Sequence, residues 1–142
     1  MEMHTFSAGT VERIGNVMKI VYKKDSEITL SDMKEITVIR EQLFGNEKYV
    51  TLIDLTDDNI DMSDEAKRYV TNNKKIKELR IAEVLLVKNF AHRLGVHTYV
   101  KIFRFNDKVT VMTKEENALH WLNNQYKKYF EKNKKDIPVE EY

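Results

Sequence analysis

Hydrophobic positions group into short runs along the first part of the chain, and these runs predict strands. Residues 6–14 and 17–22 are rich in β-branched side chains, which favour extended structure. Gly15 and Asn16 separate the two runs, and both tolerate the positive φ that a two-residue hairpin turn demands. The chain is therefore predicted to open with an antiparallel β-hairpin.

Apolar side chains then recur at three- and four-residue steps, which predicts helices. The first helix covers residues 31–44, with Ser31 as its expected N-cap and Gly45 as its end, because glycine readily takes the left-handed conformation. A second helix is predicted to start at Ser63. A last helix covers residues 113–132, and its start carries the pattern of a capping box, formed by Thr113 and Glu116.

Two further runs, residues 49–55 and 81–89, are apolar at nearly every position, which is typical of strands buried on both faces. Residues 108–112 predict another strand. The segment before it is ambiguous. A helix through about residue 101 is favoured, and the alternative is a strand with alternating aromatic residues (Tyr99, Phe103 and Phe105).

This order of elements predicts an α/β fold: a mixed, mostly parallel β-sheet with an N-terminal β-hairpin and about four helices. Residues 1–132 are expected to form a single domain, and residues 133–142 a flexible tail. The composition agrees, since 142 residues with 42% hydrophobic and 33% charged side chains suit one packed domain.

Composition also excludes several classes of function. No cysteine occurs, which excludes disulfides, thiolate zinc sites and cysteine nucleophiles. No apolar run is long enough to span a bilayer, and the N-terminus lacks the pattern of a signal peptide, so a cytoplasmic protein is expected. The net charge of +1 does not favour nucleic acid, and the lysines near the C-terminus are explained by the polar face of a helix.

Catalytic and metal-binding patterns are missing as well. The sequence has no Gly-x-Ser-x-Gly turn, no His-Glu-x-x-His and no phosphate-binding glycine loop, so neither an enzyme nor a cofactor is expected. Carboxylates after the strand at 49–55 could supply oxygen ligands to a metal, but their spacing is not that of an EF-hand. Solvation and turn formation explain them more simply (Asp54, Asp57, Asp58 and Asp61).

Three stretches carry a resemblance to a known family: VTLIDLTD, IAEVLLVKNFAHRLGVH and VTVMTKEENALHWL, which fall within about residues 49–122. In their order and spacing they resemble the STAS fold, and most closely its SpoIIAA-like branch of small bacterial proteins. In the anti-sigma-factor antagonists of that superfamily, a serine in the loop after the central strand is phosphorylated by a partner kinase. The nearest match here is Ser63, although the glycine of the family pattern is replaced by acidic residues.

The resemblance implies a non-catalytic regulatory or protein-interaction module. Its expected interaction loop contains an unusual number of acids around one serine: Asp57, Asp58, Asp61, Ser63, Asp64 and Glu65. Aromatic residues late in the last helix either cover the sheet or contact a second copy in a homodimer (Tyr126, Tyr129 and Phe130). The alternative function is a carrier of a small apolar or lipid-like ligand held between helices and sheet. Its expected lining consists of the aromatic residues of 90–105 and three methionines (Met18, Met33 and Met62).

Overall fold

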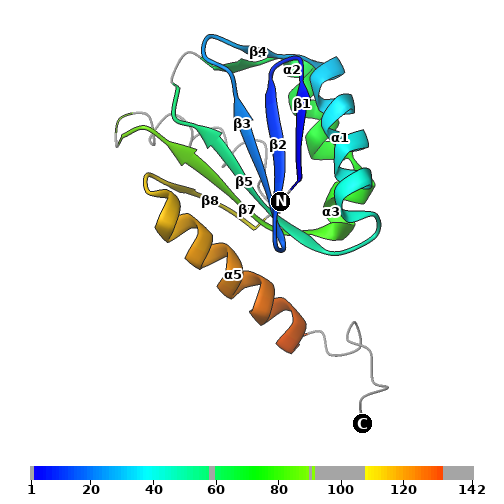
Figure 1. Ribbon diagram of the computed structural model, residues 1–142, viewed down its shortest axis with the longest axis vertical. Helices are drawn as coiled ribbons and strands as arrows, with labels where there is room; N and C mark the ends of the chain where they lie inside the picture. Colours follow the sequence, from blue (N-terminus) through cyan, green and yellow to red (C-terminus); the bar gives the residue numbers. More distant parts are fainter. Residues whose placement is uncertain (1, 58–59, 90, 92–107, 133–142) are drawn as a thin grey trace.

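A six-stranded mixed β-sheet forms the centre of the protein, and helices pack on both of its faces (Figure 1). The computed structural model describes residues 2–57, 60–89, 91 and 108–132. The sheet has the order β1-β2-β3-β5-β7-β8, and β4 and β6 form a separate two-stranded ribbon. The strands are β1 Glu2–Phe6, β2 Gly9–Ile14, β3 Val17–Tyr22, β4 Glu27–Ile28, β5 Tyr49–Leu55, β6 Asp61–Met62, β7 Arg80–Val87 and β8 Val109–Met112. The described helices are α1 Leu30–Phe44, α2 Asp64–Asn72, α3 Lys74–Leu79 and α5 Glu115–Lys132.

The N-terminal part of the sheet is antiparallel, as predicted, but it has one strand more than expected. The prediction of one strand over residues 6–14 is wrong, because a turn at residues 7–8 divides this stretch between β1 and β2. A turn this short barely interrupts the hydrophobic pattern. Gly9 was the available signal, since a Cβ atom there would lie 2.0 Å from the carbonyl oxygen of Val21. The predicted turn between β2 and β3 is confirmed, and Gly15 adopts its positive φ of 60°.

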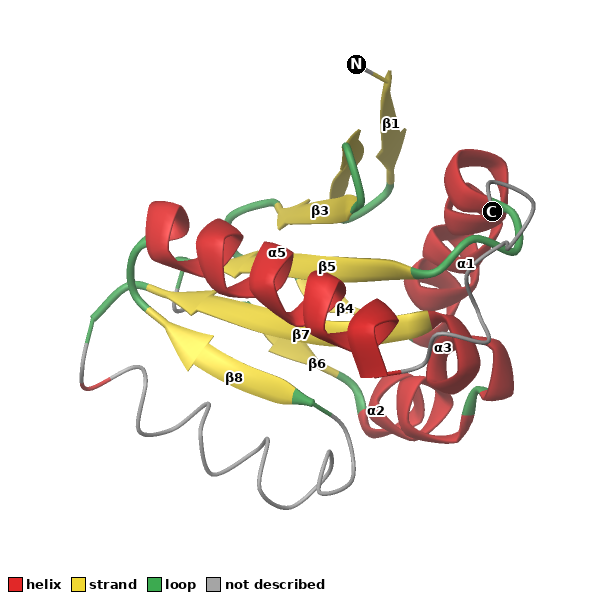
Figure 2. Ribbon diagram, turned by 90° about the horizontal axis from the view of Figure 1, so that it is seen from below, coloured by secondary structure: helices red, strands yellow, loops and turns green. Residues whose placement is uncertain are grey.

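The C-terminal part of the sheet is parallel and lies between two helical layers. β3 pairs with β5, β5 with β7 and β7 with β8, all in parallel. Figure 2 shows α5 crossing one face of these strands, while α1, α2 and α3 lie on the other side. Alternate residues of β5 and β7 therefore face two separate hydrophobic cores, which explains why these strands are apolar at nearly every position. The predicted α/β architecture is confirmed.

The N-cap of helix α1 lies two residues earlier than predicted. The expected cap, Ser31, lies inside the first turn, and Thr29 is the actual N-cap. The Thr29 hydroxyl accepts a hydrogen bond from the amide of Asp32 at 3.2 Å, and the Asp32 carboxylate accepts from the Thr29 amide at 2.8 Å. This is a capping box closed by aspartate. Both serine and threonine are good caps, so propensity alone did not choose between them.

The start of α5 also differs from the prediction. The helix begins at Glu115, and the Lys114 carbonyl accepts from the amide of Ala118 at 3.1 Å, so the expected capping box on Thr113 is out of register by one residue. Helix α3 was not predicted, and Asn73 caps it through the amide of Ile76 at 3.0 Å. The helix expected up to residue 101, the tail at 133–142 and Asp58 lie outside the described residues.

Candidate functional site

The acidic segment predicted as a loop is held against the rest of the protein by the β4–β6 ribbon. The amide of Asp61 donates to the carbonyl of Ser26 at 3.0 Å, and the amide of Ser63 donates to the carbonyl of Ile28 at 2.9 Å. Parallel pairing sets Glu27 beside Asp61, and both side chains are exposed. The ribbon therefore fixes the backbone of this segment and leaves two carboxylates on adjacent strands facing solvent.

Ser63 is the N-cap of α2, as its position in the sequence predicted. Its hydroxyl oxygen accepts a hydrogen bond from the amide of Ala66 at 3.2 Å. Asp64 and Glu65 follow in the first turn, where carboxylates interact favourably with the helix dipole. Asp64 forms a distant ion pair with Lys67, at 3.9 Å. We name the exposed carboxylates of Glu27, Asp61, Asp64 and Glu65 the acidic surface.

Several acids of this segment, including Asp61 of the acidic surface, also form local hydrogen bonds. The carboxylate of Asp54 accepts from the amide and the hydroxyl of Thr56, at 2.9 and 2.6 Å. Asp57 is half-buried, and its carbonyl accepts from the amide of Ile60 at 3.4 Å. Asp61 accepts from the amide of Met62 at 2.9 Å. Within the part of the chain that the structure describes, no three acidic or histidine side chains are grouped as ligands for a metal ion.

The aromatic residues at the end of α5 lie on the opposite side of the sheet and contact one another. Phe130 stacks against Tyr126 and Tyr129, with ring centroids 4.9 and 5.3 Å away. Tyr126 packs on the core under α5, and Lys48 Nζ lies 5.3 Å from the centre of the Tyr129 ring. Burial raises the pKa of Tyr126, and Glu47 adds to this effect while Arg13 opposes it. All three aromatic residues are half-buried within one chain, and a homodimer through them stays a prediction.

The core on the other face contains a polar cluster. Glu83 accepts hydrogen bonds from Thr51 and Arg80, each at 3.0 Å, and all three side chains are buried. Arg40 is also buried, and it donates to the carbonyl of Gly45 at 3.0 Å. A cavity of about 30 Å³ lies between this cluster and the helices, and its lining includes Met18 and Met33 but not Met62. Its size is far below the roughly 300–1,000 Å³ of ordinary ligand pockets.

Comparison with known proteins agrees with this architecture. Residues 12–127 match the model of a family described as a domain of unknown function, DUF7793. The chain belongs to this family. A solved structure of an uncharacterized protein of the DUF3478 family from Shewanella loihica PV-4, described as having a SpoIIAA-like fold, is similar to it. The identity is 18% and the TM-score 0.55, over 85% of this chain and 99% of the other. The predicted SpoIIAA-like fold is thereby confirmed. No curated protein matches the chain.

For this DUF7793 domain, sequence reasoning found most of the acidic surface but missed Glu27. The residue lies 34 positions before Asp61 and becomes its neighbour only through the β4–β6 ribbon. A two-residue strand has no readable alternation, so Glu27 gave little signal. Asp25 and Ser26, which both favour turns, were the signal in the sequence, and Asp25 adopts a positive φ of 58°. The described helices include none that is long and apolar enough to cross a membrane.

Proposed function

We propose that this protein is a non-catalytic regulatory module that binds a basic partner protein through its acidic surface. The observation that carries the proposal is the pairing of Glu27 with Asp61. Two like charges on adjacent strands repel each other, and both are exposed. The hydrogen bonds that hold the ribbon against the rest of the chain come from the backbone, and the Asp61 carboxylate adds a local bond from the Met62 amide.

Local structure explains the other two members of the acidic surface only in part. Asp64 and Glu65 suit the first turn of α2 because of the helix dipole. Glu27 and Asp61 lie on the β4–β6 ribbon, outside the first turn of α2, and they extend the negative charge away from the helix. Lysine or arginine residues on a partner would relieve this repulsion, and complementary charge mainly sets specificity and the rate of association.

Ser63 is the proposed point of regulation. Its hydroxyl lies at the N-terminus of α2, where the helix dipole also favours a phosphoryl group. A phosphoryl group would add charge beside Asp64 and Glu65 and would strengthen the negative field that the partner meets. The resemblance to the anti-sigma-factor antagonists and the position of Ser63 at the start of α2 support this assignment.

The interface is tested with two double variants of equal charge change. The double variant Glu27→Gln with Asp61→Asn removes the negative charges of the two paired carboxylates. Glu78→Gln with Glu116→Gln is the control, since both of these side chains are exposed and lie outside the acidic surface. The immobilised full chain is incubated with a lysate of its native cells, and retained proteins are quantified. We expect a partner that the first variant loses at least tenfold and the control keeps. Equal retention by both variants contradicts the proposal.

The switch is tested separately at Ser63. Both Asp and Asn are good N-caps, so Ser63→Asp and Ser63→Asn retain the helix start and differ in one negative charge. A regulatory role predicts that the two variants retain different amounts of the partner. Equal retention would limit Ser63 to its structural role and leave the interface itself unaffected.

The alternative of an apolar carrier finds less support on the face covered by α1, α2 and α3. The cavity of about 30 Å³ there is lined by core side chains and is too small to admit a lipid chain. Extraction of the purified protein with organic solvent, followed by mass spectrometry, tests the carrier directly. A stoichiometric lipid would favour the carrier over the regulatory module.

A further inference from the structure

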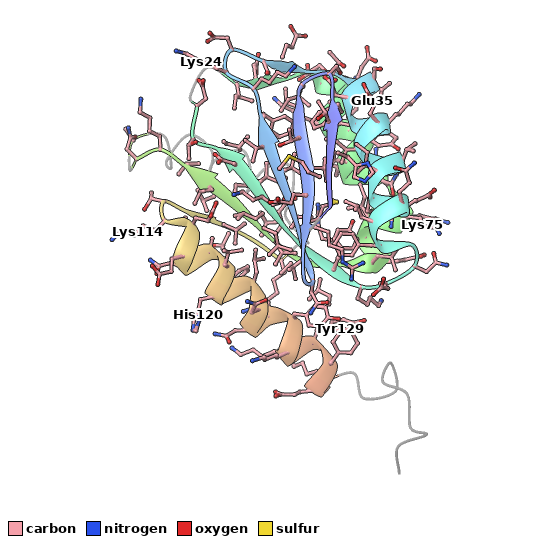
Figure 3. The ribbon with its side chains drawn as sticks, in the orientation of Figure 1. Lys24, Glu35, Lys75, Lys114, His120 and Tyr129 are labelled. Carbon is pink, nitrogen blue, oxygen red and sulfur yellow. The ribbon has the colours of Figure 1, made fainter. Side chains whose placement is uncertain are left out.

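A second site is suggested by a cleft on the opposite face of the sheet, at the end remote from the acidic surface. It has a volume of about 400 Å³, within the range of small-molecule sites. It lies where the last turns of α5 pass over the starts of β7 and β8, near Tyr129 in Figure 3. Its described lining consists of Ile81, Lys108, Gln125, Lys128, Tyr129, Glu131 and Lys132.

The charge of this cleft is mainly positive, since three lysines face one glutamate. Lys128 and Lys132 lie one helical turn apart on α5. Lys108 comes from a different element, and its backbone is anchored because its carbonyl accepts from the amide of Glu83 at 2.9 Å. The helix dipole favours lysines in the last turn of α5. It does not account for Lys108, so the convergence of charge from two elements requires another explanation.

Gln125 is the second observation that points to a ligand. The residue is only 8% exposed, and its side chain lines the cleft. An amide held beside a cationic cleft can donate to, or accept from, a bound polar group.

We propose that the cleft binds a small organic anion. Its acidic group, a carboxylate, sulfonate or phosphate, lies among Lys108, Lys128 and Lys132 and bonds to the Gln125 amide. Its apolar body lies against Ile81 and the ring of Tyr129. The site is independent of the acidic surface, because it is formed by α5 and the amino ends of β7 and β8.

The probe for the test is 8-anilinonaphthalene-1-sulfonate, titrated into the full chain and followed by its fluorescence. The matched neutral probe is N-phenyl-1-naphthylamine, which has the same rings and no sulfonate. We expect saturable binding of the anionic probe, with the neutral probe at least tenfold weaker. Lys128→Gln with Lys132→Gln should raise the Kd of the anionic probe by tenfold or more.

The control is Lys127→Gln with Lys114→Gln, which removes the same charge from lysines outside the cleft. It should change the Kd by less than twofold. The side-chain amide signals of Gln125 should shift in NMR spectra when the anionic probe is added. The proposal is overturned if no saturable binding is seen, if both probes bind equally, if the control weakens binding as much as the cleft variant, or if the shifts map elsewhere.

Discussion

Arg80 and Glu83 form an ion pair inside the protein, with Arg80 Nη1 lying 3.0 Å from Glu83 Oε1 and the two side chains 6% and 1% exposed. Residues three apart on a regular strand point to opposite faces. Here Tyr49 is paired with Arg80 while Val50 is paired with Ala82, so one extra residue is inserted into β7. This bulge turns both charged side chains toward the same core.

Replacement of one member of this pair should destabilise the protein strongly. In Glu83→Gln the guanidinium of Arg80 stays buried without its counter-charge, and such losses are typically about 3–5 kcal/mol. The measurement is urea unfolding, where the midpoint should fall while the slope stays constant. Glu47→Gln is the control, because the Arg13–Glu47 pair is 30% and 62% exposed and should contribute below about 1 kcal/mol. Equal losses in both variants would contradict the assignment.

Removal of both charges should cost less than removal of one. Arg80→Met with Glu83→Leu removes both charges of the pair, and exchanges of this kind are often neutral or stabilising. The same urea experiment measures the double variant. A double variant as unstable as the sum of its single variants would mean that the two side chains contribute independently.

The cap of α2 should contribute about 1 kcal/mol. Ser63→Ala removes the oxygen that accepts from the Ala66 amide, whereas Ser63→Asn keeps an acceptor there. Thermal unfolding should therefore give a lower midpoint for the alanine variant and a nearly unchanged midpoint for asparagine. If the alanine and asparagine variants unfold at the same temperature, the hydroxyl has no capping role in solution.

Asp32 should link stability to acid pH. Burial alone would raise the pKa of this carboxyl, but hydrogen bonds from Ser7 and from the amide and hydroxyl of Thr29 outweigh it and hold the pKa below 3.8. A depressed pKa contributes stability that is present above the unfolded value and is lost as the pH falls through the folded value. The free energy of unfolding of the wild type should therefore be lower below pH 3.8 than at neutral pH. Asp32→Asn should be less stable than the wild type at neutral pH, and its stability should depend less on acid pH.

Ser7→Ala is the companion variant for this test. It removes one of the hydrogen bonds to the ionised carboxylate, so the pKa of Asp32 should rise toward its ordinary value. Carboxyl chemical shifts followed through an acid titration measure this change. An Asp32 pKa that does not respond to Ser7→Ala would mean that the serine has no electrostatic effect.

Tyr49 should make the protein sensitive to alkaline pH. Burial raises the pKa of its hydroxyl from 10.0 to about 12, against the opposing influence of Arg80 and Arg40. Between these two values the unfolded chain releases a proton that the folded chain keeps, so stability falls as the pH rises. Tyr49→Phe should reduce this fall between pH 10 and 12, measured by urea unfolding. An identical alkaline loss in the variant would contradict the raised pKa.

Hydrophobic periodicity was enough to predict the α/β class and the positions of the longest elements. Residues 49–55 form a strand where predicted, because burial on both faces requires nearly every residue to be apolar. The strand predicted over residues 108–112 is observed at 109–112. The Ser63 cap was also readable, since few residue types can satisfy the free amides at a helix start. These features depend on residues close together in the chain.

Tertiary structure decided what local pattern could not. Three polar arrangements join distant residues or depend on strand register. They are the pairing of Glu27 with Asp61, the common face of Arg80 and Glu83, and the cleft around Gln125. The sequence by itself determined which segments are strands and helices, through periodicity, caps and turns. Only packing determined which polar side chains meet, because a pairing register and a bulge are set by the burial of whole elements and not by any single residue.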